Sequence, residues 1–83
     1  MKLTVYTTPS CTYCVELKNW LDKEGLSYVE KDVSTDKDAF LKMEELTASK
    51  AVPVTRIETD KGSQTILGFN APEFAAIIKD YRN

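Results

Sequence analysis

The 83-residue sequence contains no histidine and only two cysteines. Without histidine the chain has no imidazole to act as a general base near neutral pH. A zinc site needs four ligands, so this chain cannot complete one from its own cysteines and histidines, and we expect no bound metal. The cysteines stand at positions 11 and 14, too close together to join distant parts of a fold as the disulfides of small secreted domains do. Their spacing therefore indicates chemistry rather than architecture.

The sequence also lacks an excess of one charge and any long apolar run. Thirteen acidic residues stand against eleven basic ones along the whole chain, for a net charge of −2. No basic stripe is available for a phosphate backbone, and we expect no nucleic-acid partner. No apolar stretch has the length of a signal peptide or a membrane span. We therefore expect no membrane association and a cytoplasmic location.

What the chain does have is an ordinary globular composition, with 42% hydrophobic and 29% charged residues, unlike that of a disordered segment. A chain this short buries only roughly 60% of the surface that its unfolded state exposes, so its core must be compact. Internal repeats, low-complexity tracts and linkers are absent from the sequence. We expect residues 1–83 to form one domain that works as a monomer.

Hydrophobic periodicity predicts a strand over residues 2–7, followed by a turn at 8–10. Ser10 or Cys11 stands at the N-cap of a helix over 12–24, which Gly25 ends. The expected apolar positions of this helix are Val15, Leu17, Trp20 and Leu21. A second strand covers 26–33, and the polar residues 34–36 then cap a second helix over 37–48. The expected apolar face of the second helix is formed by Ala39, Phe40, Met43 and Leu46.

The rest of the sequence predicts a hairpin and a last helix. Strands over 52–58 and 64–67 flank a turn at 59–63, in which Gly62 can adopt positive φ. Asn70 followed by Glu73 is a variant capping box for a third helix that ends the chain. Its expected buried residues are Phe74, Ile77, Ile78 and Tyr81. The order β-α-β-α-β-β-α predicts an α/β fold, in which a mixed four-stranded sheet is flanked by three helices.

Cys11-Thr12-Tyr13-Cys14 stands where the first helix should begin. A Cys-X-X-Cys pair beside a β-α-β unit is typical of the thioredoxin-like fold and of redox activity. Unpaired backbone N–H groups and the helix dipole stabilise a thiolate at this end of a helix. Each unit by which the pKa of a thiol falls corresponds to ~1.4 kcal/mol of thiolate stabilisation. We therefore predict that Cys11 attacks a disulfide and that Cys14, one turn further in and less acidic, resolves the mixed disulfide.

Other interpretations of these residues stay open. The cysteine pair could be a structural disulfide, although so short a loop constrains the unfolded chain little, or a chance spacing. An iron-sulfur cluster held between two copies of the chain is a further alternative. Taken alone, Pro53 could simply begin an edge strand, and Tyr13 is unremarkable as an exposed aromatic residue. Two carboxylates of the first helix, Glu16 and Asp22, are candidate proton acceptors, but the sequence does not place either of them near Cys14.

The sequence resembles the glutaredoxin family over nearly its whole length. The resemblance rests on T-T-P-S-C-T-Y-C after the first strand, A-V-P-V at 51–54 and I-L-G-F-N before the last helix. It implies a thiol-disulfide oxidoreductase in which the bond before Pro53 is cis and faces the cysteines. It also implies that the backbone of Val52 pairs with an extended peptide or with glutathione, and that Tyr13 lines the substrate groove. Gly68 would let a substrate backbone approach closely, and Phe69 belongs to the groove wall or, as we favour, to the core.

Departures from the family pattern concern the reductant. Glutathione-using members carry a basic residue where this chain has Thr8, and Gly-Gly followed by Thr/Ser-Asp where it has Leu67-Gly68 and Asn70-Ala71. Charge-assisted contacts to the glutathione carboxylates are worth roughly 1.5–3 kcal/mol each, so their loss should weaken glutathione binding. Two cations, Lys50 and Arg56, remain as other sources of charge.

The G-F-N-A-P-E stretch is similar to the G-F-R-P-D of redoxins that serve ribonucleotide reductase and take electrons from thioredoxin reductase. Here Asn70 replaces the arginine, and one residue is inserted before Pro72. We therefore predict a redoxin that reduces protein disulfides by a dithiol mechanism, with ribonucleotide reductase as one client. The expected alternative is glutathione-dependent deglutathionylation. We expect no bound cofactor but an external reductant, either thioredoxin reductase with NADPH or glutathione. The predicted substrate-binding residues are Thr8, Thr12, Tyr13, Val52, Pro53, Gly68, Phe69 and Asn70.

Overall fold

The computed structural model describes residues 1–48 and 51–82. Its elements follow the predicted order and are β1 (Lys2–Thr7), α1 (Thr12–Lys23), β2 (Val29–Asp32), α2 (Lys37–Thr47), β3 (Val54–Thr59), β4 (Gly62–Leu67) and α3 (Ala71–Arg82). The four strands form one sheet in the order β2-β1-β3-β4. β1 pairs with β2 in parallel, whereas β1 with β3 and β3 with β4 are antiparallel. The predicted mixed sheet of the thioredoxin-like type is therefore confirmed.

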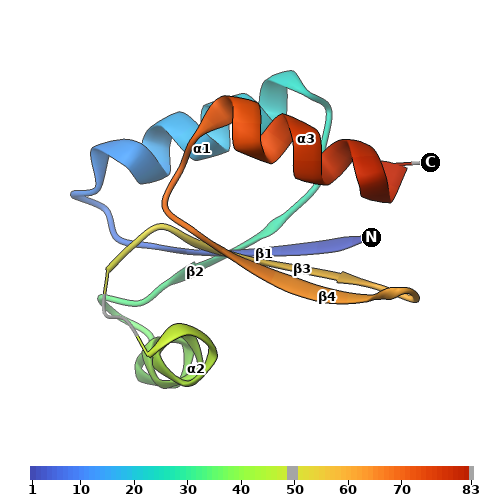
Figure 1. Ribbon diagram of the computed structural model, residues 1–83. Coiled ribbons are helices and arrows are strands. Elements are labelled where there is room, and N and C mark those ends of the chain that lie inside the picture. Colours follow the sequence, from blue (N-terminus) through green and yellow to red (C-terminus); the bar gives the residue numbers. More distant parts are fainter. Residues whose placement is uncertain (49–50, 83) are drawn as a thin grey trace.

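Helices cover both faces of this sheet, α1 and α3 on one face and α2 on the other (Figure 1). Because successive strand residues point to opposite faces, β1 supplies Val5 to one core cluster and Tyr6 to the other. The cluster beneath α1 and α3 consists of Leu3, Val5, Leu17, Leu21, Ile57, Ile66, Phe74 and Ile78. The cluster beneath α2 consists of Tyr6, Ala39, Met43 and Val54. Two layers of helix thus fix the sheet between them.

The predicted start of the second strand was wrong, because β2 begins at Val29 rather than at residue 26. The N–H of Leu26 is used to close α1, donating to the carbonyl of Leu21 at 3.0 Å after Gly25 turns the chain with φ +70°. Leu26 and Tyr28 then pack on the cluster beneath α1 and α3. Helix closure and burial therefore occupy the residues that sequence alone assigns to the strand.

The hairpin also differs from its predicted bounds at both strands. β3 begins at Val54 instead of residue 52, since a proline at 53 has no N–H to donate to a ladder. β4 begins at Gly62 instead of residue 64, because Thr59 already pairs with Gly62 across a two-residue turn. The hydroxyl of Thr59 supports this turn by donating to the Gly62 carbonyl at 3.0 Å. Gly62 has φ +131°, as its predicted role in the turn requires.

The apolar faces of the helices are largely as predicted. Helix α1 buries Cys14, Leu17 and Leu21, which lie on one face. The prediction was wrong for Val15, which is 47% exposed because it follows directly after the buried Cys14 and turns away from that face. The predicted apolar residues of α2 and α3 all belong to or pack against the two clusters.

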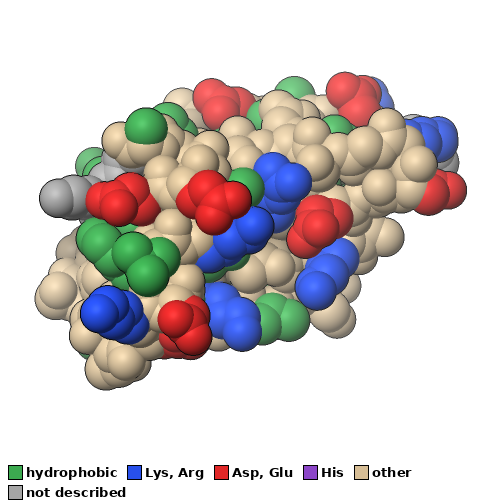
Figure 2. Space-filling view, turned by 90° about the horizontal axis from the view of Figure 1, so that it is seen from below, with side chains coloured by type: hydrophobic (Ala, Val, Ile, Leu, Met, Phe, Trp, Pro, Cys, Tyr) green, Lys and Arg blue, Asp and Glu red, His purple; other side chains and the backbone are tan. Residues whose placement is uncertain are grey.

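No helix among residues 1–48 and 51–82 is long and apolar enough to cross a membrane. On the α2 side of the molecule, basic and acidic side chains are interspersed, so neither sign of charge gathers there (Figure 2). A hollow of about 220 Å³ on this side is lined by Tyr6, Lys31, Asp36, Asp38, Ala39 and Lys42. The pairing of both signs around it gives no preference for an anion or a cation.

Candidate functional site

The sheet register brings the predicted site residues to one end of the molecule. Tyr6 of β1 pairs with Val54 of β3, which pairs in turn with Leu67 of β4. The chain that follows β1, the chain that precedes β3 and the chain that follows β4 therefore leave the sheet at the same end. Helix α1 begins there as well (Figure 1). Residues from three separate parts of the sequence thus surround the start of α1.

Cys11 and Cys14 form a disulfide at this helix start, with their Cα atoms 5.2 Å apart. Cys11 is the N-cap residue, in extended conformation with φ −89° and ψ 112°. The backbone N–H of Cys14 donates to Cys11 Sγ at 3.1 Å, so one of the otherwise unpaired amides points at that sulfur. Cys11 is half-buried, whereas Cys14 is 0% exposed. Of the two sulfurs, Cys11 is therefore the one that a partner can reach.

The residues flanking Cys11 shape the approach to its sulfur. The Cys11 N–H donates to the carbonyl of Thr8 at 3.3 Å, which closes the turn between β1 and α1. Thr8 is half-buried, and Thr12 and Tyr13 are exposed on the first turn of the helix. Tyr13 leaves 61% of its surface open. Such an aromatic surface beside the sulfur is available to a partner, and the predicted groove role of Tyr13 stays a prediction.

The peptide bond between Val52 and Pro53 is cis, as the resemblance to glutaredoxins implies. Pro53 is buried, and its carbonyl accepts the N–H of Gly68 at 2.8 Å, which ties the start of β3 to the end of β4. Val52 is half-buried and packs on the cluster beneath α2. Gly68 has φ +74°, and no atom lies within 4 Å of the position of a Cβ there. Its backbone conformation requires glycine, and the open space beside it leaves room for a partner.

Phe69 and Asn70 hold the loop that follows β4. The Phe69 ring lies 6.3 Å from the ring of Trp20 and 5.5 Å from that of Phe74, so its favoured core position is confirmed. Asn70 Oδ1 accepts the N–H of Glu73 at 3.1 Å, which makes Asn70 the predicted cap of α3. The two side chains therefore fix the loop that joins β4 to α3 beside the site.

Of the two cations considered for glutathione, Lys50 lies outside the described residues. Arg56 donates from Nη1 to Thr65 Oγ1 at 3.1 Å. It stands two residues inside β3, where it pairs with Thr4 of β1, on the face that carries α2. Arg56 therefore points away from the start of α1, and nothing in its position adds a positive charge to Cys11.

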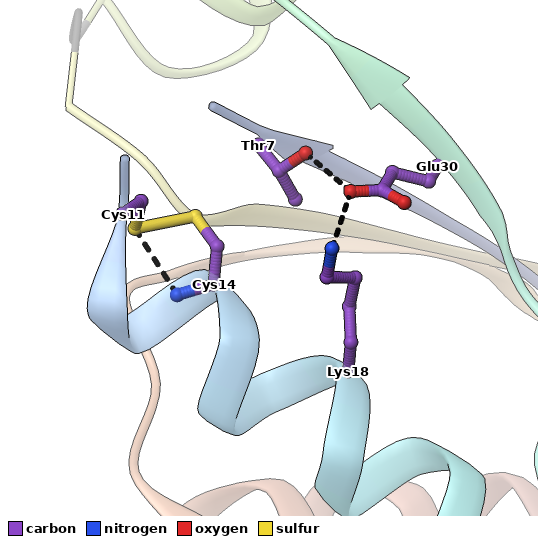
Figure 3. The surroundings of a disulfide bond; sticks show 5 residues. All are labelled: Thr7, Cys11, Cys14, Lys18 and Glu30. Atoms are coloured by element: carbon purple, nitrogen blue, oxygen red, sulfur yellow. Dashed lines mark hydrogen bonds and ion pairs between the residues drawn. A yellow bond between two sulfur atoms is a disulfide. The ribbon is translucent and has the colours of Figure 1, made fainter. Parts of the chain in front are cut away.

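A charged group near the disulfide escaped the sequence reasoning. Glu30 Oε2 accepts hydrogen bonds from Lys18 Nζ at 2.8 Å and from Thr7 Oγ1 at 2.7 Å (Figure 3). The hydrogen bond from Lys18, followed by that from Thr7, lowers the pKa of the Glu30 carboxyl. The same bond to Glu30 raises the pKa of Lys18. Lys18 stands four residues after Cys14, a helical spacing that could have been noticed, whereas its partner on β2 depends on the strand register.

Among the described residues, no group of three or more cysteine, aspartate or glutamate side chains could hold a metal ion. Glu16 is exposed on α1. Asp22 stands two helical turns beyond Cys14, where its charge interacts with Lys18 and Tyr28. Neither carboxylate is therefore placed as a proton acceptor for the buried sulfur.

Comparison with known proteins agrees with this geometry. A sequence model of the glutaredoxin family matches residues 3–60. The chain is 34% identical over 67 residues to a glutaredoxin of Neisseria meningitidis, covering 78% of this chain and 79% of the relative. It is 29% identical to an uncharacterized glutaredoxin-like protein in the rubredoxin operon of Clostridium pasteurianum, covering 93% of this chain and 97% of that protein. The crystal structure of the thioredoxin-like protein BC3987 superposes with a TM-score of 0.79 at 29% identity, covering 90% and 97% of the two chains.

Proposed function

The chain belongs to the glutaredoxin family, and from that premise we propose that it reduces disulfides in other proteins through Cys11 and Cys14. The observation that carries this proposal is the contrast between the two sulfurs. Cys11 is half-buried at the N-cap and its Sγ accepts an amide hydrogen bond, while Cys14 is fully buried one turn further along α1. The first position favours an accessible thiolate, and the second a sulfur that reacts only within the protein.

The proposed reaction transfers two electrons in two exchanges. The Cys11 thiolate attacks one sulfur of the client disulfide, so that a bond from Cys11 to the client forms and the client disulfide breaks. The departing client sulfur leaves as a thiolate and takes a proton from water. Cys14 then loses its proton and attacks Cys11 Sγ, which forms the internal disulfide and releases the second client sulfur. The protein ends oxidised, in the state that the structure contains.

An external reductant must then return the pair to the dithiol, and we propose thioredoxin reductase with NADPH for this step. The proposal is supported by three residues, none of which places a charged group for glutathione beside Cys11. Thr8 occupies the position where glutathione-using members carry a basic residue. Arg56 donates a hydrogen bond to Thr65 on the face of the sheet that carries α2, and Asn70 Oδ1 caps α3. Glutathione carries two carboxylates, and its recognition depends on charge-assisted hydrogen bonds.

The reductant is tested by oxidising the protein and following NADPH consumption with either thioredoxin reductase or glutathione plus glutathione reductase. We expect rapid turnover with the first system and slow turnover with the second. Rapid reduction by glutathione alone would contradict the proposed reductant and would favour deglutathionylation. A Cys11→Ser variant serves as the control in both systems, because it retains Cys14 and removes the attacking sulfur.

For the client, we propose protein disulfides that include the one of ribonucleotide reductase. The support is the partial similarity of G-F-N-A-P-E at 68–73 to redoxins that serve that enzyme. We also propose that the protein works as a colourless monomer without a bound cofactor. Visible absorbance together with dimerisation after anaerobic purification would instead favour an iron-sulfur cluster carrier.

A further inference from the structure

The Lys18 ammonium is fixed on the side of α1 that carries Cys14. Lys18 follows Cys14 by four residues, a spacing that places two side chains next to each other on a helix. Figure 3 shows both side chains leaving α1 on the side that faces the sheet. The ammonium ends 2.8 Å from Glu30 Oε2, and the hydroxyl of Thr7 binds the same oxygen at 2.7 Å. Glu30 therefore holds the charge beside the sheet, with the Lys18 and Glu30 side chains 29% and 39% exposed.

Cys14 needs such a charge, because its surroundings oppose the form of the sulfur that reacts. A thiol becomes a nucleophile only after losing its proton, and burial disfavours the resulting thiolate. Cys14 is 0% exposed, and its backbone N–H is already donated to Cys11 Sγ. The other basic residue of α1 is Lys23, in the last turn of the helix. Lys18 is thus the positive charge of α1 that lies near the buried sulfur.

Glu30 is better suited to holding Lys18 than to accepting the proton of Cys14. The hydrogen bonds from Lys18 and Thr7 lower the pKa of Glu30, which makes its carboxylate a weak base. A carboxylate with two donors on one oxygen instead orients those donors. Glu30 therefore serves the site by keeping the Lys18 ammonium in place.

We propose that Lys18, held by Glu30, to which Thr7 also donates, is a positioning residue whose ammonium favours the thiolate of Cys14 as that sulfur displaces the client. This inference rests on the proposed function, since it concerns the second of the two exchanges. The proton of Cys14 passes to water, and the bond between Cys14 and Cys11 forms as the bond between Cys11 and the client breaks. The client sulfur leaves with the electron pair and takes a proton from water.

The other charged groups around this pair are few. Asp22 and Tyr28 interact electrostatically with Lys18, and Asp32 interacts electrostatically with Glu30. The β3 residues on this face, Thr55, Ile57 and Thr59, are uncharged. The described charged residues of α3, Glu73, Lys79 and Asp80, are exposed. A variant that changes Lys18 alone leaves all of these groups in place, so a change in the pH dependence of resolution is assigned to the Lys18 charge.

The two exchanges can be followed separately with the reagent dithionitrobenzoate. Attack by Cys11 releases a first thionitrobenzoate and leaves the second bound to Cys11, and attack by Cys14 releases that second one. Both releases are recorded by stopped-flow absorbance across a range of pH for the reduced wild-type protein and for Lys18→Met. We expect the second phase of the variant to slow about tenfold near neutral pH, with its pH profile displaced to higher pH. The first phase should stay unchanged, because it belongs to Cys11.

Three further variants separate charge from packing. Lys18→Arg keeps the charge and should resolve at nearly the wild-type rate, while Lys18→Gln keeps a donor for Glu30 and should resolve slowly. Lys42→Met is the matched control, since it removes the exposed pair with Glu45 at 3.8 Å on α2. It should leave both phases unchanged.

The proposal is overturned if Lys18→Met and Lys18→Gln resolve at the wild-type rate and pH, or if Lys18→Arg slows as much as they do. If Lys18→Met folds poorly, comparing the resolution rates of Lys18→Gln and Lys18→Arg still tests whether the charge at position 18 matters. A wild-type protein that shows no first phase contradicts the proposed function itself. The two failures are therefore distinguishable in one experiment.

Discussion

Two buried threonines of the sheet make a matched pair for testing how the site is stabilised. Thr7 and Thr55 are 2% and 0% exposed, and both point to the face that carries α1 and α3. The hydroxyl of Thr7 donates to Glu30, whereas no described residue provides a partner for Thr55 Oγ1. Valine has nearly the shape of threonine without the hydroxyl, so replacing each one isolates that group. We expect Thr55→Val to stabilise the protein and Thr7→Val to destabilise it.

The size of each change in the free energy of unfolding depends on whether the hydroxyl that is removed makes a hydrogen bond. A buried hydroxyl without a hydrogen bond costs about 1–3 kcal/mol, and we take the lower end, because the added methyl must fit an already packed sheet. Thr55→Val should therefore raise the free energy of unfolding by about 1 kcal/mol. Thr7→Val loses a bond to a charged acceptor worth roughly 1.5–3 kcal/mol and gains apolar burial of about 0.8 kcal/mol, which leaves a net loss of about 1 kcal/mol.

Thermal unfolding followed by circular dichroism measures both changes. In a domain of this size about 1 kcal/mol moves Tm by roughly 4–8 °C, so the two variants should differ from the wild type in opposite directions by that amount. Urea titration provides the free energies independently. Shifts of the same sign in both variants would refute the assignment of one hydroxyl as bonded and the other as unpartnered.

Four other predictions concern the site directly. Cys11→Ser should abolish disulfide reduction and Cys14→Ser should accumulate mixed disulfides visible by mass spectrometry, and equal residual activity in both would contradict their roles. In the reduced protein the Cys11 thiol should be more acidic than free cysteine when thiolate absorbance is titrated, since its sulfur accepts an amide at the helix start; ordinary acidity would oppose the mechanism. Thr8→Lys should lower the KM for glutathione about fivefold, because the added charge attracts a glutathione carboxylate by roughly 1 kcal/mol. High salt should screen this attraction and remove the change, so a change in KM that does not depend on salt would point to another cause. Gly68→Ala should lower the free energy of unfolding in urea by about 1 kcal/mol because of its φ of +74°, and an unchanged midpoint would count against that strain.

The sequence predicted the fold well because local signals and global topology agree. Alternating residues at 2–7 and caps at Cys11 and Asn70 are short-range features that can be read without coordinates. The parallel pairing of β1 with β2 follows from a single helical crossover, for which few arrangements exist. Errors occurred at strand ends, where residue 26 serves the close of α1 and Pro53 cannot join a ladder. There, tertiary packing and hydrogen-bond supply outweigh propensity.

The candidate site divides in the same way. Cys11, Cys14 and Tyr13 are local to one helix start, so their relative positions followed from spacing. The interaction of Lys18 with Glu30 joins residues twelve positions apart, and it depends on the exact register in which Glu30 lies beside Val5. A shift of one residue would turn Glu30 to the α2 face, where Lys18 could not reach it. Single-sequence reasoning does not determine register to one residue, which is why this pair was missed.

In the proposed reaction, the surroundings of the two sulfurs also determine the order in which they react. A client disulfide can reach Cys11, which is half-buried, but not Cys14, which is 0% exposed. The first bond to the client must therefore involve Cys11, and Cys14 can react only after that bond exists. Burial protects Cys14 from outside thiols but also disfavours its thiolate, and in our proposal the Lys18 ammonium on the same helix face offsets that cost. On this proposal, accessibility selects the attacking sulfur, and the Lys18 charge held by Glu30 sets how quickly the buried sulfur completes the exchange.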